Sequence, residues 1–312
     1  MSLWRRFLVH VDADSRRRDV VRAASELAVD SGAAVKLVDV VDAPGWHHLT
    51  SRRRSLEGGV LSVAAEQKRE RLSALAEPLR AAGLEVSVEI LVGSPWPAVL
   101  KEVGKRGHDL VMLAARRQRG LRQVVLGGTA HHLVRHAPCP VYIVHPGHPR
   151  RPRRILVAVD PGDEDVSRER AAKLVRVALE LAALSGARVD VVHAWRPFAE
   201  RIVRHRVSQD DLRAYVEETR RRAVVELRSL LAPFADRFEP RAARLIKGDP
   251  VTVVPALSAE LGSDLLVLGT VARTGIAGVL IGNTAEEILD RIACSVLVVK
   301  PDGFVSPLRL ED

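Results

Sequence analysis

The chain contains little cysteine, few aromatic residues and no long apolar run. Among its 312 residues there are 2 cysteines, Cys139 and Cys294, and aromatic residues make up 4% of the composition. So little cysteine excludes a disulfide-rich secreted scaffold. No window approaches ~18 uninterrupted apolar residues, and the start (MSLWRRFLVH) has no apolar stretch of signal-peptide length. We therefore expect a cytoplasmic protein without a membrane span.

Motifs of the common catalytic sites are also missing. The sequence contains no GxSxG, GxxxxGK[ST], CxxC or HExxH pattern. His132 and His136 lie four residues apart on a predicted helix, but no acidic third ligand stands at a recognisable spacing, so no metal site is expected. The pattern therefore argues against an efficient enzyme and allows at most a slow ATPase.

Positive charge is concentrated in the first half of the chain. The net charge is +9; residues 1–150 hold 23 Lys and Arg against 15 Asp and Glu, whereas residues 151–312 hold 25 against 24. Basic clusters beside predicted loops can meet anions. With so few aromatic residues there is little for nucleobases to stack on, so nucleic acid is not the expected partner.

The sequence contains an internal repeat of two copies. RRFLVHVD (5–12) corresponds to RRILVAVD (153–160), and GGTAHHLVRHAPCPVYIVHP (127–146) corresponds to GNTAEEILDRIACSVLVVKP (282–301). Between the copies, HPGHPRRPR (145–153) has three prolines and no apolar residues, which is typical of a linker. Two domains are predicted, 1–148 and 149–312.

Strands and helices alternate in each copy. This alternation predicts an α/β fold, with two tandem, open, mostly parallel five-stranded sheets covered by helices on both faces. In the second copy the predicted strands are 154–159, 187–194, 241–246, 264–269 and 295–300. Ligands of such sheets lie beyond the carboxyl ends of the strands, where Asp12 and Asp160 follow the first strand of each copy.

A glycine-rich segment, GTVARTGIAGVLIGNT (269–284), joins the strand DLLVLGT (264–270) to the predicted helix TAEEILDRIA (284–293). Unpaired N–H groups at a helix start favour an anion, and glycine lets a bulky phosphate approach the backbone closely. The segment is therefore either a phosphate-binding loop or a tight turn between strand and helix.

These residues resemble the universal stress protein family in its tandem form. The family's nucleotide motif is Gly, two residues, Gly, nine residues, Gly, then Ser or Thr. Gly269, Ala272, Gly282 and Asn283 fall on that spacing, with Ala272 in place of the second Gly and Asn283 in place of the hydroxyl residue. The second half, through the tail KPDGFVSPL, resembles most closely the E-type members.

The resemblance implies a stress-response protein that binds ATP or another adenine nucleotide, with or without Mg²⁺, in its second domain and acts as a ligand-dependent regulator. The implied binding residues are Asp160 on the adenosine side, Val192 with its backbone against the base, Gly269 and Thr270 under the sugar and α-phosphate, Ala272 and Arg273 in the loop, and Gly282, Asn283 and Thr284 around the phosphates. The alternative is a carrier or sensor of a lipid-like or other apolar ligand.

The first copy departs further from the motif. Its segment AARRQRGLRQVVLGGT (114–129) has Ala114 and Arg117 at the first two glycine positions, while Gly127, Gly128 and Thr129 keep the distal half. Without glycine, close approach of a phosphate is lost. The first domain is therefore predicted to carry a degenerate site, or to receive a different anion on its arginines.

In the family, single domains pair through their final strands. The resemblance implies the same contact inside this chain, between PVYIVHP (140–146) and SVLVVKP (295–301), as an intramolecular pseudo-dimer. An antiparallel pairing would keep Cys139 and Cys294 apart, so two free, mostly buried thiols are expected. Other surfaces could still join two chains into a homodimer.

Overall fold

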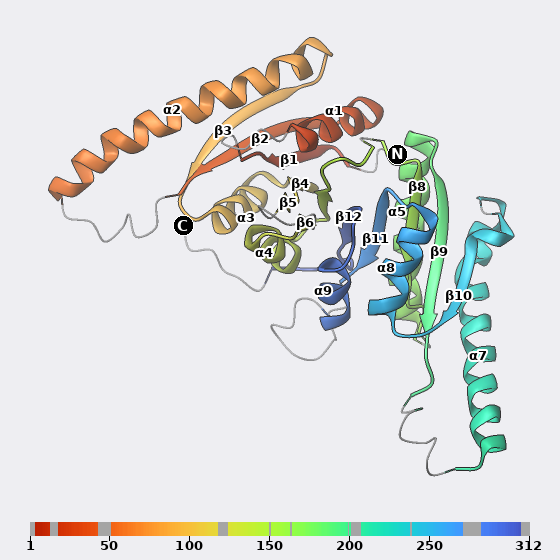
Figure 1. Cartoon of the computed structure of the whole chain (residues 1–312). Helices are drawn as coiled ribbons and strands as arrows, with labels where there is room; N and C mark the ends of the chain where they lie inside the picture. Colours follow the sequence, from red (N-terminus) through yellow and green to blue (C-terminus); the bar gives the residue numbers. More distant parts are fainter. Residues whose placement is uncertain are drawn as a thin grey trace. The chain divides into compact units, whose positions relative to one another are not determined.

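The structure is a computed structural model, and it describes residues 4–12, 18–42, 51–117, 124–149, 151–162, 164–198, 200, 207–237, 239–270 and 282–306. Figure 1 shows the elements along the chain. The strands are β1 (Arg6–His10), β2 (Ala34–Val41), β3 (Val86–Val92), β4 (Leu110–Ala114), β5 (Arg116–Arg117), β6 (Val124–Val125), β7 (Val141–Val144), β8 (Arg154–Ala158), β9 (Arg188–Trp195), β10 (Ala243–Lys247), β11 (Leu265–Gly269) and β12 (Ser295–Val299). The helices are α1 (Asp19–Ser31), α2 (Ser51–Ala81), α3 (Pro95–Arg106), α4 (Gly128–His136), α5 (Asp165–Ser185), α7 (Gln209–Leu231), α8 (Pro250–Leu261) and α9 (Asn283–Leu289), with 3₁₀ turns η2 (Ala232–Arg237) and η3 (Pro240–Ala242).

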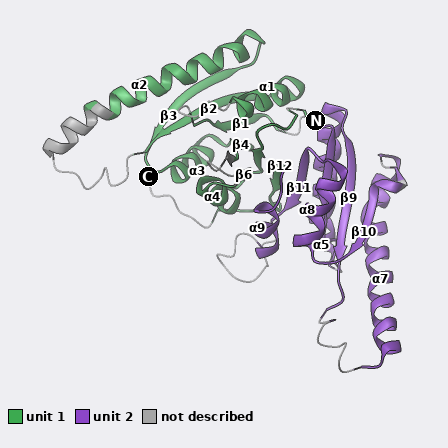
Figure 2. Ribbon diagram, in the orientation of Figure 1, with its two compact units in different colours: residues 1–151, 272–281, 295–312 green, residues 152–271, 282–294 purple. Residues whose placement is uncertain are grey.

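The chain forms two compact units (Figure 2). Unit 1 contains the described residues of 1–151 and 295–312, and its strands are ordered β12-β7-β4-β1-β2-β3. Unit 2 contains those of 152–271 and 282–294, and its strands are ordered β10-β9-β8-β11. Every ladder in these two sets is parallel except the one between β12 and β7. The predicted α/β fold is confirmed.

Apolar patterning decides which strands lie inside each sheet. β4 (LVMLA) and β12 (SVLVV) are apolar along almost their whole length and are buried, as expected for strands covered on both faces. β3 and β10 each stand at one end of the strand order of their unit, and their side chains are only partly buried or exposed. The cores therefore centre on the other strands.

Two ion pairs on β2 show that helices cover both faces of the unit 1 sheet. Asp39 accepts a hydrogen bond from Lys68 of α2 at 2.9 Å, and Lys36 pairs with Glu102 of α3. Side chains three positions apart on a strand point to opposite faces, so α2 and α3 lie on opposite faces. In unit 2, α5 packs against α7 and α8 packs against α9. Within the described part of the chain, no helix is long and apolar enough to cross a membrane.

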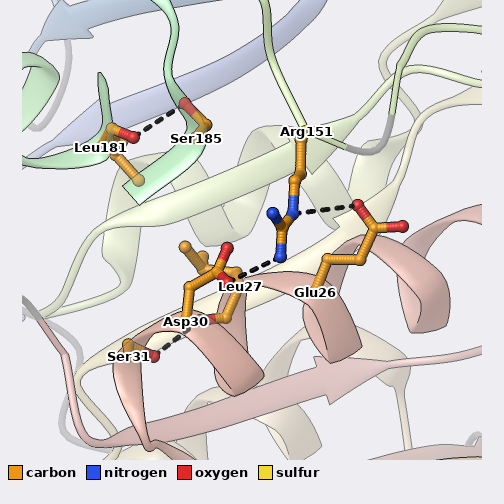
Figure 3. A network of polar contacts seen from close by, with 7 residues as sticks. All are labelled: Glu26, Leu27, Asp30, Ser31, Arg151, Leu181 and Ser185. Carbon is orange, nitrogen blue, oxygen red and sulfur yellow. Dashed lines mark hydrogen bonds and ion pairs between the residues drawn. The ribbon is translucent and has the colours of Figure 1, made fainter. Parts of the chain in front are cut away.

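The first helix of each repeat ends in the same way. The Ser31 hydroxyl donates to the Leu27 carbonyl at 2.7 Å, and the Ser185 hydroxyl donates to the Leu181 carbonyl at 2.8 Å (Figure 3). The next residues, Gly32 and Gly186, have φ values of 68° and 70° and so end α1 and α5 in the left-handed region that favours glycine. The repeat seen in the sequence is thus a repeat of local hydrogen bonding.

The final strands of the two repeats pair antiparallel, as predicted. Leu297 of β12 lies opposite Tyr142 of β7, and the amide of His145 donates to the Ser295 hydroxyl at 3.0 Å. Cys139 and Cys294 are free and buried, which confirms the expected thiols. β12 therefore belongs by sequence to the second repeat and by pairing to the sheet of unit 1.

The segment predicted as a linker is anchored to α1 at one residue. The guanidinium of Arg151 lies 2.6 Å from the Asp30 carboxylate and 3.8 Å from the Glu26 carboxylate (Figure 3). Because the Arg151 side chain is half exposed, this pair is worth about 1 kcal/mol or less. It ties the segment before β8 to α1.

Candidate functional site

The candidate site lies in unit 2, where β8 ends between β9 and β11. In the last steps of the parallel ladder Ala158 pairs with Val192, and the Val159 amide donates to the Val192 carbonyl at 2.9 Å. Asp160 follows directly and its side chain is exposed. The carboxylate therefore stands at the carboxyl edge of the sheet, where parallel sheets bind their ligands.

Val192 lies inside this ladder rather than at the end of its strand. It is 1% exposed, and its carbonyl already accepts the Val159 amide. N–H and C=O groups of every second residue of a strand face the same neighbouring strand, so Ala194 faces the β8 side as Val192 does, but beyond the last ladder bond. Ala194 is thus the first residue on this side of β9 whose backbone lies beyond the last bond to β8. The sequence prediction missed it, because only the register shows where β8 stops.

His193 lies between these two residues and is buried, with 6% of its surface exposed. Its Nδ1 is 3.2 Å from the Val159 carbonyl oxygen. Burial lowers the pKa of His193, although the Asp160 carboxylate and the Val159 carbonyl act to raise it. The imidazole is therefore neutral at pH 7, and it donates its Nδ1 proton to that carbonyl.

Gly269 and Thr270 close β11 next to β8. A Cβ added to Gly269 would lie 3.4 Å from a methyl of Leu174 on α5, which is ordinary contact. Thr270 is 3% exposed, and its buried hydroxyl has no hydrogen-bond partner among the described residues. An unpaired buried hydroxyl is costly, so Thr270 is a polar group in need of a partner at the predicted position.

The phosphate end of the predicted site is the start of α9. Gly282 is the N-cap residue, with φ −73° and ψ 138°, and its carbonyl accepts the Ala285 amide at 2.9 Å. The Asn283 and Thr284 side chains that follow are exposed. Because any residue can adopt this φ, only close approach of another group would require glycine at position 282.

Two predicted residues, Ala272 and Arg273, lie outside the described residues. The other members of the predicted set are in unit 2: Asp160, Val192, Gly269, Thr270, Gly282, Asn283 and Thr284. The strand order β9-β8-β11 places Asp160 and Gly269 at the carboxyl ends of two adjacent strands, whereas Val192 lies within β9, beside β8.

The corresponding part of unit 1 contains a short two-stranded ladder. Ala114 ends β4, and Arg116–Arg117 then forms a short antiparallel ladder with Val124–Val125. The sequence predicted no such ladder. Gly127 is the N-cap of α4, with φ −70° and ψ 159°, close to the values at Gly282. Arg119 and Arg122 lie outside the described residues.

The histidine pair of α4 packs against a tryptophan. The rings of Trp96 and His132 are stacked with centroids 4.5 Å apart, and His136 stacks on Trp96 at 5.7 Å. In the part of the chain that the structure describes, no three His, Cys, Asp or Glu side chains form a group that could hold a metal ion. The pair therefore contributes to the packing of α4 on α3.

The comparisons with known proteins agree with this architecture. The model of the universal stress protein family matches residues 3–145 and 152–300. The chain therefore belongs to the universal stress protein family, as two copies of its domain.

Among its relatives is Universal stress protein E of Escherichia coli K12, which is 28% identical over 100% of this chain and 99% of that protein. The Universal stress protein E homolog of Haemophilus influenzae is 30% identical over 65% of this chain and 66% of that protein. A crystal structure from Pseudomonas aeruginosa UCBPP-PA14, described as a universal stress protein, has a TM-score of 0.73 at 25% identity and covers 96% of this chain and 95% of that one. The resemblance to E-type tandem members is thereby confirmed.

Proposed function

We propose that unit 2 binds an adenine nucleotide, ATP or a close relative, and that the chain acts in stress tolerance as a ligand-dependent regulator. One observation carries the proposal. The ladder ends bring an exposed carboxylate, Asp160, together with the end of β9 that extends past β8 and with β11. The residue after β11 is Thr270, whose buried hydroxyl has no partner among the described residues. These groups match a ribose, a base and a sugar-phosphate in that order.

The residues present fit such a ligand chemically. A carboxylate accepts hydrogen bonds from ribose hydroxyls, and backbone N–H and C=O groups can pair with a base edge. Glycine at position 282, the N-cap of α9, carries no side chain that would keep a phosphate away from the helix start. In this proposal Ala272 and Arg273 line the loop, and Asn283 and Thr284 offer an amide and a hydroxyl to the phosphates. No residue is assigned to Mg²⁺.

We further propose that function divides with the repeat, at 1–148 and 149–312, although unit 1 includes β12. The first domain keeps only the distal glycines, Gly127 and Gly128, and we assign it no nucleotide. Its role is to pair with β12. The free, buried thiols of Cys139 and Cys294 suit a reducing cytoplasm, which is the location we propose.

Two experiments test the proposal: native mass spectrometry of the purified chain, and then calorimetric titration of the chain with ATP and Mg²⁺. We expect one nucleotide per chain. A lipid-like mass in place of a nucleotide, with no heat on adding ATP, would instead support the carrier of an apolar ligand. ATP hydrolysis faster than a slow background rate would contradict the proposal of a regulatory protein without catalytic residues.

A further inference from the structure

We propose that the side chain at one position of the repeat decides whether the backbone at the end of the second strand is open to a ligand. This position is His193 in unit 2 and Asp39 in unit 1. The inference rests on the proposed nucleotide site and names a positioning residue for it. His193 and Asp39 occupy the same place in the repeat, in VVHA and LVDV. The two side chains pair with different backbone groups: His193 with the Val159 carbonyl, and Asp39 with the Val40 amide.

The ladder explains what would occur without His193. Since the Val159 amide donates to the Val192 carbonyl, a continued parallel ladder would next pair the Ala194 amide with the Val159 carbonyl. Instead, the imidazole of His193 donates to that carbonyl from Nδ1 at 3.2 Å. The Val159 carbonyl is thus satisfied, and among the described residues the Ala194 amide has no backbone partner.

Among the described residues the carbonyl of Ala194 also has no backbone partner, for a different reason. A continued ladder would pair it with the amide of residue 161, but residue 161 is proline and has no N–H to donate. Ala194 therefore presents one donor and one acceptor, side by side, just beyond the last bond between β8 and β9. An adenine edge offers the complementary pair, a ring nitrogen that accepts and an amino group that donates.

Unit 1 shows the opposite arrangement. The Asp39 carboxylate accepts the amide of Val40, the equivalent of Ala194, at 2.7 Å. The second carboxylate oxygen accepts Lys68 at 2.9 Å, which holds the side chain in place. Asp39 is 3% exposed. The amide that would meet a base is therefore occupied in unit 1, independently of the missing glycines.

Calorimetric titration with ATP and Mg²⁺ tests this assignment in the full chain. His193→Asp places a carboxylate beside the Ala194 amide and beside Asp160, so we expect affinity to fall by about tenfold or more. His193→Asn keeps a side-chain N–H that can donate to the Val159 carbonyl, so it should stay within about threefold of the wild type. Asp39→Asn, the matched change in unit 1, should leave the affinity unchanged.

Amide hydrogen exchange of the ligand-free chain, followed by NMR, tests the backbone itself. We expect the Ala194 amide to exchange much faster than the Val40 amide, and His193→Asp to slow Ala194. ATP should protect Ala194 in the wild type and in His193→Asn. Equal protection of Ala194 and Val40 without ligand would overturn the inference.

The two experiments separate the inference from the proposed function. If the wild type binds no ATP, the proposed function fails, while the exchange of Ala194 and Val40 still decides the inference. If the wild type binds ATP and His193→Asp binds it equally well, the inference fails and the proposed function stands.

Discussion

At the scale of single residues, Gly282 and Gly127 form a natural matched pair. Both are N-cap residues, of α9 and α4, and both have an extended backbone with φ near −70°. Neither backbone needs glycine for its conformation, because the left-handed region begins only at positive φ. A substitution at either position therefore tests the space around the helix start and not the strain in the chain.

Gly282→Val is expected to abolish ATP binding, because a β-branched side chain would fill the space that a phosphate needs. Both substitutions should lower the free energy of unfolding by about 1 kcal/mol, because valine is a poorer N-cap residue than glycine. Gly127→Val should leave ATP binding unchanged. Calorimetry and thermal unfolding of both variants check this. Two equivalent nucleotide sites in the wild type, or equal ATP affinity in both variants, would contradict the assignment to unit 2.

Lys300, 2% exposed, contributes a pH dependence to stability. Its ammonium donates to the carbonyls of Val134 and Arg135 at the end of α4, and lies 4.6 Å from the centre of the Phe304 ring. Burial lowers the pKa of Lys300 from 10.5 to about 8. Between pH 8 and 10.5 the unfolded chain thus binds more protons than the folded chain, so this residue makes the free energy of unfolding rise with pH there.

Lys300→Met should remove that rise. Across this window we expect the free energy of unfolding of the wild type to increase relative to the variant by at most about 3 kcal/mol. Urea unfolding at pH 7, 8, 9 and 10 measures the difference. A difference that stays constant with pH would show that the Lys300 pKa is the same in the folded and unfolded chains.

At the scale of elements, helix ends are set by glycines at positive φ. Gly107 ends α3 with φ 61°, whereas Gly104 lies exposed within the same helix. Nothing lies within 4 Å of a Cβ added at Gly104, and at Gly107 the nearest group is the flexible end of Arg6. The two glycines therefore differ mainly in backbone conformation.

Replacing glycine by alanine is expected to have opposite effects on stability at the two positions of α3. Gly107→Ala should destabilise the chain by about 1–2 kcal/mol, because alanine must adopt the left-handed region. Gly104→Ala should stabilise it by about 0.5–1 kcal/mol, because glycine is a poor residue inside a helix. Chemical unfolding of the two variants gives the values, and effects of the same sign would refute this account of the helix end.

At the scale of the whole molecule, the two thiols report on folding of both units. Burial raises the pKa of Cys139 to about 12 and that of Cys294 to about 11. Thiolates are the reactive form, so at pH 8 the native chain should react slowly with a thiol reagent. Denatured, unreduced protein should show both of its 2 cysteines as free thiols. Recovery of fewer would reveal a disulfide and contradict the structure.

The basic first half gives a second whole-molecule prediction. Its excess of Lys and Arg should cause weak retention of DNA at low salt, falling steeply as ionic strength rises. Gel-shift titrations between 50 and 200 mM salt, concentrations at which the electrostatic part of binding changes by roughly orders of magnitude, measure it. Tight, sequence-dependent binding at physiological salt would argue for a nucleic-acid partner.

Several features of this protein follow from its sequence alone. Internal repetition and the alternation of apolar strands with amphipathic segments indicated the α/β fold and its two copies, and the resemblance to the universal stress protein family implied the pairing of β12 with β7 and the free cysteines. These features depend on local pattern and on the repeat, which the order of residues contains directly. The place of Asp160, directly after the first strand of the second repeat, could be predicted for the same reason.

Other features were decided only by the tertiary structure. The shift from Val192 to Ala194, the contact of His193 with Val159, and the occupied amide beside Asp39 all depend on where one strand stops relative to its neighbour. That register is set by packing between segments far apart in the chain. If the register shifted by one residue, backbone groups that are now paired would be open and open groups would be paired. Local sequence patterns do not encode that difference.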